Sequence, residues 1–227
     1  MTTYTGTDNL EVMAEAVNYN RFLIDQIAAL AAPGDRILDF GAGIGTFALA
    51  LAGKGHGVDC LEPDAAQAAR LTALGLTAHT RLEQLQDRHY DYIYTANVLE
   101  HIEDDAGTLA ALAGKLRAGG KLLIYVPAFQ LLYSSMDRKV GHLRRYRREP
   151  LAALAAAAGF TGIRCGYVDS LGFAASLAFR AIGNDTGDIN MTALKLYDRV
   201  AFPLSRGLDR VTSRWFGKNV LLTATRP

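Results

Sequence analysis

Short apolar runs alternate with stretches of helical periodicity through the first half of the chain. The runs are too short for buried helices, and glycine, proline or polar residues bound them, which is typical of strands. The predicted strands cover residues 37–40, 57–62, 76–79, 91–96 and 121–126. Between them, helices are predicted at 46–51, 65–74 and 106–117, the last with Gly119-Gly120 as its C-cap. Strands alternating with helices over about 100 residues predict an α/β fold with a doubly wound, mostly parallel sheet.

Two helical segments flank this core. Residues 10–31 place apolar side chains roughly on one helical face, so residues 1–34 are predicted to form an N-terminal helical cover. A helix at 150–158 has no N-capping residue before it, and a sixth strand follows at 160–169. About 50 residues then precede a seventh strand at 219–225, where a plain fold would need only a hairpin. We expect helices at 171–182 and 193–202, stopped by Pro203, in a helical insertion over 170–217 that covers the substrate.

The chemistry concentrates where the first predicted strand ends. Asp39 lies within that apolar run, and Gly41, Gly43 and Gly45 follow at alternate positions before a helix begins. The carboxyl ends of parallel strands are the usual place for a nucleotide-like ligand, and glycines let the backbone approach it closely. A dinucleotide site has the different spacing G-x-G-x-x-G, with a diphosphate at the helix start. A carboxylate at Asp39 would repel a diphosphate and attract a cationic ligand.

A second acid strengthens this interpretation. Glu62 ends the second strand about 20 residues further on, where a carboxylate accepts hydrogen bonds from ribose hydroxyls. S-adenosyl-L-methionine has a ribose, a sulfonium and an ammonium, but no phosphate. These stretches, with residues 97–102 and 116–124, resemble the class I S-adenosylmethionine-dependent methyltransferases. The resemblance covers residues 10 to 162 and implies a seven-stranded Rossmann-like methyltransferase fold whose last strand is antiparallel to the sixth.

The resemblance also implies the site residues on the cofactor side. Tyr19, in the N-terminal cover, is expected near the reactive methyl group. His101 is interpreted as structural, because a lone histidine near a helix end more often is. The expected cofactor contacts are Asp39, Gly41, Ala42, Gly43, Gly45, Glu62, Pro63, Leu82, Asn97 and Val98.

A loop after the fifth strand carries the acceptor-side candidates. Its segment Gly141-His-Leu-Arg-Arg-Tyr146 resembles a signature of one bacterial methyltransferase subgroup, in which an Asp precedes the His, as Asp137 does here. His142, oriented by Asp137, is our candidate base, since histidine titrates in the right range. Arg144, Arg145 and Tyr146 are the candidates for binding an acidic substrate. The alternatives are that these side chains tie down the loop, form a solvated basic face or touch anionic lipid.

Composition bounds these predictions. The chain has 227 residues, half of them hydrophobic, and a formal net charge of +1, so we expect a single domain with no nucleic-acid partner. Residues 1–8 lack the basic and apolar regions of a signal peptide, and no run of 18 apolar residues occurs, so a cytoplasmic location without stable membrane insertion is expected. The two cysteines are interpreted as buried thiols, and no metal site is predicted. The pattern does not indicate an oligomeric state.

The predicted activity is methyl transfer to O or N of a small or medium-sized acceptor molecule, with acidic compounds among the candidate acceptors. One alternative keeps the cofactor and changes the reaction, for example to an intramolecular cyclisation of the sulfonium compound. Another is a non-catalytic cofactor-binding or membrane-surface partner that uses the basic loop and the apolar insertion. A nicotinamide dehydrogenase is disfavoured by Asp39 and by the glycine spacing.

Overall fold

The computed structural model describes residues 12–182 and 190–227. One seven-stranded sheet forms its centre, with strand order β3-β2-β1-β4-β5-β7-β6. The strands are β1 (Arg36–Phe40), β2 (Gly57–Leu61), β3 (Thr77–His79), β4 (Tyr90–Ala96), β5 (Leu116–Pro127), β6 (Thr161–Val168) and β7 (Asn219–Thr225). Only β7 runs antiparallel to its neighbours β5 and β6, which confirms the predicted fold class.

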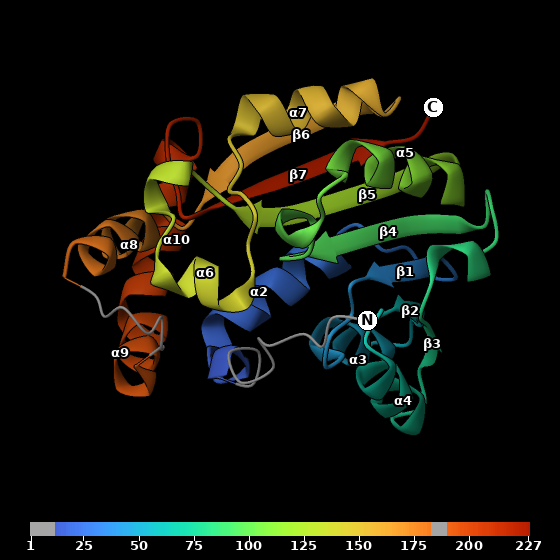
Figure 1. The fold of residues 1–227 in the computed structure, drawn as a ribbon, viewed down its shortest axis with the longest axis horizontal. Coiled ribbons are helices and arrows are strands. Elements are labelled where there is room, and N and C mark those ends of the chain that lie inside the picture. Colours follow the sequence, from blue (N-terminus) through green and yellow to red (C-terminus); the bar gives the residue numbers. More distant parts are fainter. Residues whose placement is uncertain (1–11, 183–189) are drawn as a thin grey trace.

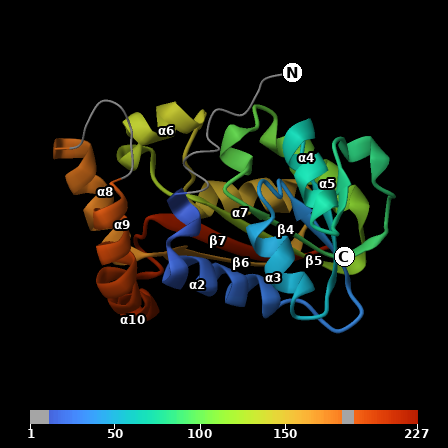
Figure 2. The same cartoon turned by 90° about the horizontal axis from the view of Figure 1, so that it is seen from below.

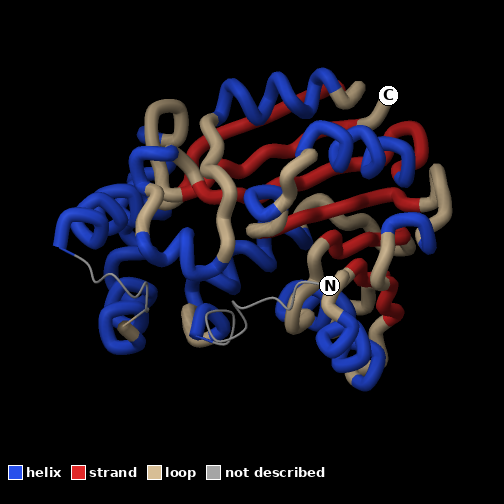
Figure 3. Tube along the Cα trace, viewed as in Figure 1, coloured by secondary structure: helices blue, strands red, loops and turns tan. Residues whose placement is uncertain are grey.

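Helices cover both faces of the sheet (Figures 1 and 2). Helices α5 (Asp105–Lys115) and α7 (Arg148–Ala157) pack on one face, where Leu112 and Leu151 join a core with Ile93 and Ile124. The other face carries α2 (Val17–Ala28), α3 (Thr46–Ala52), α4 (Ala65–Ala73) and α10 (Phe202–Thr212). Figure 3 separates this three-layer arrangement into central strands and outer helices. The sheet is therefore buried on both sides, as its apolar strands require.

The predicted N-terminal helix is interrupted in the structure. Residues 12–14 are helical, the helix breaks at residues 15 and 16, and α2 then begins at Val17. The buried Asp198 carboxylate, from the insertion, accepts hydrogen bonds from the backbone N–H groups of Asn18 and Tyr19, each at 2.9 Å. A carboxylate from a distant part of the sequence thus caps the N-terminus of α2. Residues 1–11 of the predicted cover lie outside the described residues.

The predicted helix boundary at Gly119-Gly120 is wrong. Helix α5 ends at Lys115, and both glycines lie within β5, where they exchange backbone hydrogen bonds with Arg226. The pairing of β4 with β5 shifts register between Tyr90 and Tyr92, and Gly119 has φ +75°. A glycine is therefore used here for an irregularity in a strand rather than for a helix end.

Pro203 does not stop a helix either. The insertion contains α8 (Ser170–Ile182), α9 (Met191–Leu196), a π-helical turn (Tyr197–Ala201) and α10, in whose first turn Pro203 lies. Proline is tolerated there because its missing N–H is one that the first turn leaves without an intrahelical partner.

Helix α7 begins at Arg148, two residues before the prediction, and its backbone N–H donates to the Tyr167 hydroxyl at 3.2 Å. This contact supplies the N-terminal partner that the sequence did not reveal.

The predictions about the two cysteines and about membrane-spanning segments can be compared with the structure. Cys60 is buried, Cys165 is half-buried, and neither forms a disulfide. Within the described part of the chain, every helix is too short or too polar to cross a bilayer.

Candidate cofactor and acceptor site

The glycine turn after β1 is built to lie close to the segment after β4. The backbone N–H groups of Gly41 and Ala42 both donate to the Leu61 carbonyl, at 2.9 and 3.1 Å. Gly41 has φ +86°, and a Cβ there would lie 2.2 Å from Cγ2 of Val98. Gly45, with φ +85°, is the residue before α3. A side chain at Gly41 would therefore strain the backbone and overlap Val98, and one at Gly45 would overlap Leu71.

Two buried carboxylates stand beside the turn. The Tyr94 hydroxyl donates to Asp39 at 2.8 Å, and Asp39 is 1% exposed. Burial raises the pKa of Asp39 to about 7, and the nearby charge of Glu62 adds to the shift. Glu62 accepts from the N–H groups of Gly43 and Asp64 at 2.8 and 2.9 Å, and burial raises its pKa as well.

Among the described residues, neither Asp39 nor Glu62 forms an ion pair with Lys or Arg, so both acids lack a positive partner. A ligand with a sulfonium and an ammonium would supply that charge, and ribose hydroxyls would replace backbone donors at Glu62. The site thus fits S-adenosyl-L-methionine.

The other predicted cofactor residues follow neighbouring strands. Asn97 and Val98 come directly after β4, and Asn97 has φ +56° with its N–H bound to the Tyr125 carbonyl at 2.8 Å. Pro63 is exposed after β2, and Leu82 begins a 3-10 turn after β3. Because β1 to β4 are parallel, all of these positions lie at one edge of the sheet.

Tyr19 reaches this edge from α2. Its ring packs edge-on against Tyr125 and Phe202, with centroids 6.1 and 5.6 Å apart. Burial raises the pKa of Tyr19 to about 12, and hydrogen bonding that involves Tyr125 and Asn97 opposes the shift. The hydroxyl is therefore neutral at ordinary pH and lies near a predicted cofactor contact.

The acceptor-side loop is organised by Asp137, which is fully buried. Its carboxylate accepts from His142 Nδ1 at 2.7 Å and from Arg145 Nε and Nη2 at 2.8 and 2.9 Å. Burial alone would raise the pKa of Asp137, but the hydrogen bonds from His142 and Arg145 hold it well below its usual value. The predicted pairing of His142 with Asp137 is present in the structure.

The three residues predicted to bind substrate are engaged by protein groups. Arg145 is buried against Asp137, Arg144 donates to Asp105 at 2.8 Å, and the Tyr146 hydroxyl donates to Asp105 at 2.8 Å. This arrangement favours the alternative in which these side chains tie down the loop.

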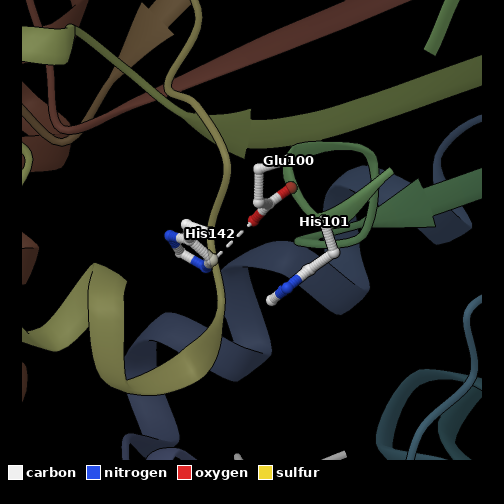
Figure 4. Close-up of side chains that lie close together, drawn as sticks. All are labelled: Glu100, His101 and His142. Carbon is white, nitrogen blue, oxygen red and sulfur yellow. Dashed lines mark ion pairs between the residues drawn. The ribbon is translucent and has the colours of Figure 1, made fainter. Parts of the chain in front are cut away.

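Sequence reasoning missed Glu100 altogether. Its side chain is 0% exposed, and one carboxylate oxygen lies 3.6 Å from His142 Nε2 (Figure 4). The ring centroids of His101 and His142 lie 4.7 Å apart, so residues from the segment after β4 and from the loop meet here. Burial raises the pKa of Glu100 to about 8. The available signal was an acid next to His101, in a segment that we interpreted only as a cofactor contact.

Comparisons with known proteins indicate the family to which the chain belongs. The family described as "Methyltransferase domain" matches residues 13–164. The chain is 30% identical over 116 residues to a ubiquinone biosynthesis O-methyltransferase of Xanthomonas campestris pv. campestris, with 46% of this chain and 48% of that protein covered. The chain thus spans about half the length of this relative.

Solved structures share the fold at low identity. A phosphoethanolamine N-methyltransferase 2 of Haemonchus contortus, in complex with S-adenosyl-L-methionine, has a TM-score of 0.63 at 19% identity, covering 92% of this chain and 52% of that one. The [4+2]-cyclase SpnF has a TM-score of 0.62 at 20% identity, covering 92% and 84%. With more than half of its length matched by the family, the chain belongs to the methyltransferase domain family, whose cofactor is S-adenosyl-L-methionine.

Proposed function

We propose that this protein transfers a methyl group from S-adenosyl-L-methionine to O or N of a small or medium-sized acceptor in the cytoplasm. The observation that carries the proposal is the pair of buried carboxylates, Asp39 and Glu62, which lie beside the glycine turn and have no Lys or Arg partner among the described residues. An oxygen nucleophile is favoured over nitrogen by the named activity of the relatives that match the sequence.

The cofactor supplies a methyl group already activated by its sulfonium. Asp39 would offset the positive charge of the methionine end, and Glu62 would bind the ribose. Asn97, Val98 and Tyr19 would close the site around the sulfur and exclude water, which is the protein's main task in an in-line displacement.

Deprotonation of the acceptor is assigned to His142, which is held by Asp137 and Arg145 near the carboxyl ends of the parallel strands. His142 Nδ1 donates to Asp137, so Nε2 has its lone pair directed away from that carboxylate. Such an imidazole accepts a proton from a hydroxyl or ammonium group, while the buried Asp137–Arg145 pair keeps the ring in place.

The test has two stages. Calorimetry of the purified chain with S-adenosyl-L-methionine and with NAD should give binding of the first and none of the second. Incubation with methyl-labelled cofactor and a panel of catechols, phenols, carboxylates and amines should then transfer label to at least one acceptor. His142→Gln should reduce turnover by about 100-fold or more, and His56→Gln is the matched control.

Two results would refute the proposal: binding of NAD in preference to S-adenosyl-L-methionine, or consumption of the cofactor without any acceptor. The second would favour intramolecular cyclisation.

A second candidate function rests on the surface of the insertion. Six apolar side chains recur every three or four residues from the last residue of α9 to just beyond α10 and are 45–65% exposed: Leu196, Val200, Leu204, Leu208, Val211 and Trp215. Exposed arginines at 199, 210 and 214 lie in the same segment. We propose that this face rests on an anionic membrane surface, because such a helix combines apolar burial with attraction to acidic lipid.

Vesicle sedimentation tests this second candidate. The wild-type chain should bind phosphatidylglycerol vesicles and bind phosphatidylcholine vesicles much more weakly. Leu204→Glu/Val211→Glu should lose binding while methyl transfer to a water-soluble acceptor is unchanged. Equal binding by the double variant, or burial of the face in a dimer seen by ultracentrifugation, would contradict the membrane assignment.

A further inference from the structure

Three metal-binding side chains meet beside the cofactor edge. Glu100 and His101 follow β4, and His142 comes from the loop that precedes α7 (Figure 4). One possible ligand atom from each lies within 4.8 Å of the other two. Two ligands on opposite sides of a transition-metal ion are separated by about 4.2 Å, because each metal–ligand bond is about 2.1 Å. A slight contraction of the cluster would therefore enclose an ion.

Of the three side chains, the buried Glu100 carboxylate would be stabilised most by a bound cation. The side chain is fully buried, and neither oxygen receives a hydrogen bond of ordinary geometry from the described residues. His142 Nε2 lies 3.6 Å from the nearer oxygen, which is too long for a hydrogen bond. It is a common separation for two ligands of the same cation. A buried carboxylate without partners is costly, and a bound cation would remove that cost.

Both histidines are already oriented as metal ligands usually are. His142 Nδ1 is bound to Asp137, whose own position is fixed by the two hydrogen bonds from Arg145. His101 is in contact with the backbone of Gly141 through a hydrogen bond. Metal-ligating histidines almost always use their second ring nitrogen in this way, to a carboxylate or to a backbone carbonyl.

We propose that Glu100, His101 and His142 bind one divalent transition-metal ion, such as Zn²⁺ or Mn²⁺. Two imidazoles and one carboxylate suit these ions and leave coordination positions open for an exogenous oxygen ligand. The sequence predicted no metal site, because the ligands come from two segments about 40 residues apart in the chain.

The location gives the ion a use in the proposed function, on which this part of the inference rests. Glu100 lies two residues after Val98, so the ion would be next to the cofactor edge. An acceptor hydroxyl bound at an open position loses its proton to water more readily than a free hydroxyl does. With the ion bound, His142 Nε2 would be a metal ligand and could not also accept a proton, so the ion would take over the activation of the acceptor oxygen that the imidazole performs in the metal-free protein. The acceptor would then be a hydroxyl compound, best with a second oxygen beside the first.

Metal binding can be measured without cofactor or acceptor. The full chain, stripped with EDTA and dialysed, should be titrated with Zn²⁺ by calorimetry and with Mn²⁺ by electron paramagnetic resonance. We expect one ion per chain. Affinity should fall at least about tenfold in Glu100→Gln and in His142→Gln. The control His56→Gln should bind as the wild type does, because His56 comes just before the amino end of β2, at the opposite edge of the sheet. Circular dichroism and S-adenosyl-L-methionine binding show that each variant is folded.

Two further readings separate this inference from the proposed function. Co²⁺ should give visible absorption bands in the wild type that change in His142→Gln. Absence of saturable binding of Zn²⁺ and Mn²⁺, or equal affinity in all four proteins, would overturn the metal site, whatever the activity. Saturable binding lost in the two ligand variants would support it even if no acceptor is methylated.

Discussion

Asp39→Asn tests whether the cofactor site is maintained at the expense of stability. Asp39 is buried without a cationic partner in the described structure, and the Tyr94 hydroxyl donates to it at 2.8 Å. An amide at this position keeps the size of the side chain and an oxygen that can accept from Tyr94. It removes the charge that we expect to attract the cofactor.

The size of the effect follows from the pKa. Burial raises the pKa of Asp39 from an ordinary 3.8 to about 7. The folded protein therefore keeps a proton that the unfolded chain loses between about pH 4 and pH 7, and wild-type stability falls as pH rises through this window. Compared with a carboxyl group of unshifted pKa, Asp39 lowers the stability of the fold by about 4 kcal/mol at pH 8, where the folded protein holds it ionised, and by about 2 kcal/mol at pH 5, where the folded protein keeps it protonated, at about 1.4 kcal/mol per pKa unit.

Asp39→Asn should thus gain stability over the wild type by about 2–3 kcal/mol more at pH 8 than at pH 5. The new amide N–H groups cost about 1–3 kcal/mol if they find no acceptor, but that cost is the same at both pH values. Urea unfolding without cofactor, followed by circular dichroism, measures the difference. Calorimetry should show that affinity for S-adenosyl-L-methionine falls at least about tenfold.

The control is Glu103→Gln, an exposed acid whose replacement should give no such pH dependence. The same stability difference at pH 5 and pH 8, or unchanged cofactor affinity, would refute the argument that a buried charge is retained here for ligand binding.

Three other substitutions test separate parts of the structure. Gly41→Ala should lower cofactor affinity by calorimetry and lower the free energy of unfolding by about 1–3 kcal/mol, because φ is +86° and the new Cβ would overlap Val98; Gly34→Ala, at φ +84° with open space, should leave affinity unchanged. Asp137→Asn should lower the free energy of unfolding in urea by about 3–5 kcal/mol, since it leaves a buried arginine without its partner; a loss below 1 kcal/mol would contradict this. Asp198→Asn should cost about 1–3 kcal/mol by weakening the start of α2, and unchanged thermal melting would argue against that cap.

The central strands and the glycine turn could be predicted because their signals are local. A short apolar run such as 121–126 is compatible with a buried strand and with few other structures. Strand β7 was predicted with the bounds that it has in the structure. The errors arose where a distant residue decides the local structure. Gly119 looks like a helix end until its pairing with Arg226 is known. The start of α2 depends on Asp198, about 180 residues away.

The acceptor side was only partly predictable for the same reason. The pairing of Asp137 with His142 could be proposed because the two residues are close in sequence. The position of Glu100 opposite His142 could not, because it depends on how the loop after β5 folds back over the end of β4. Buried charge has no sequence signature of its own. The sequence suggested that Arg145 binds an acidic substrate, whereas its side chain is buried against Asp137.

The position of β7 in the sheet determines whether a fragment truncated at its C-terminus can fold. Strand β6 precedes β7 in sequence, yet it is joined to the sheet only through β7, which lies between it and β5. A fragment that stops before Asn219 would leave β5 and β6 with two bare edges and no means of pairing across the gap. Such a fragment should aggregate rather than fold, whereas adding residues 219–227 as a separate peptide should restore a soluble, cofactor-binding complex.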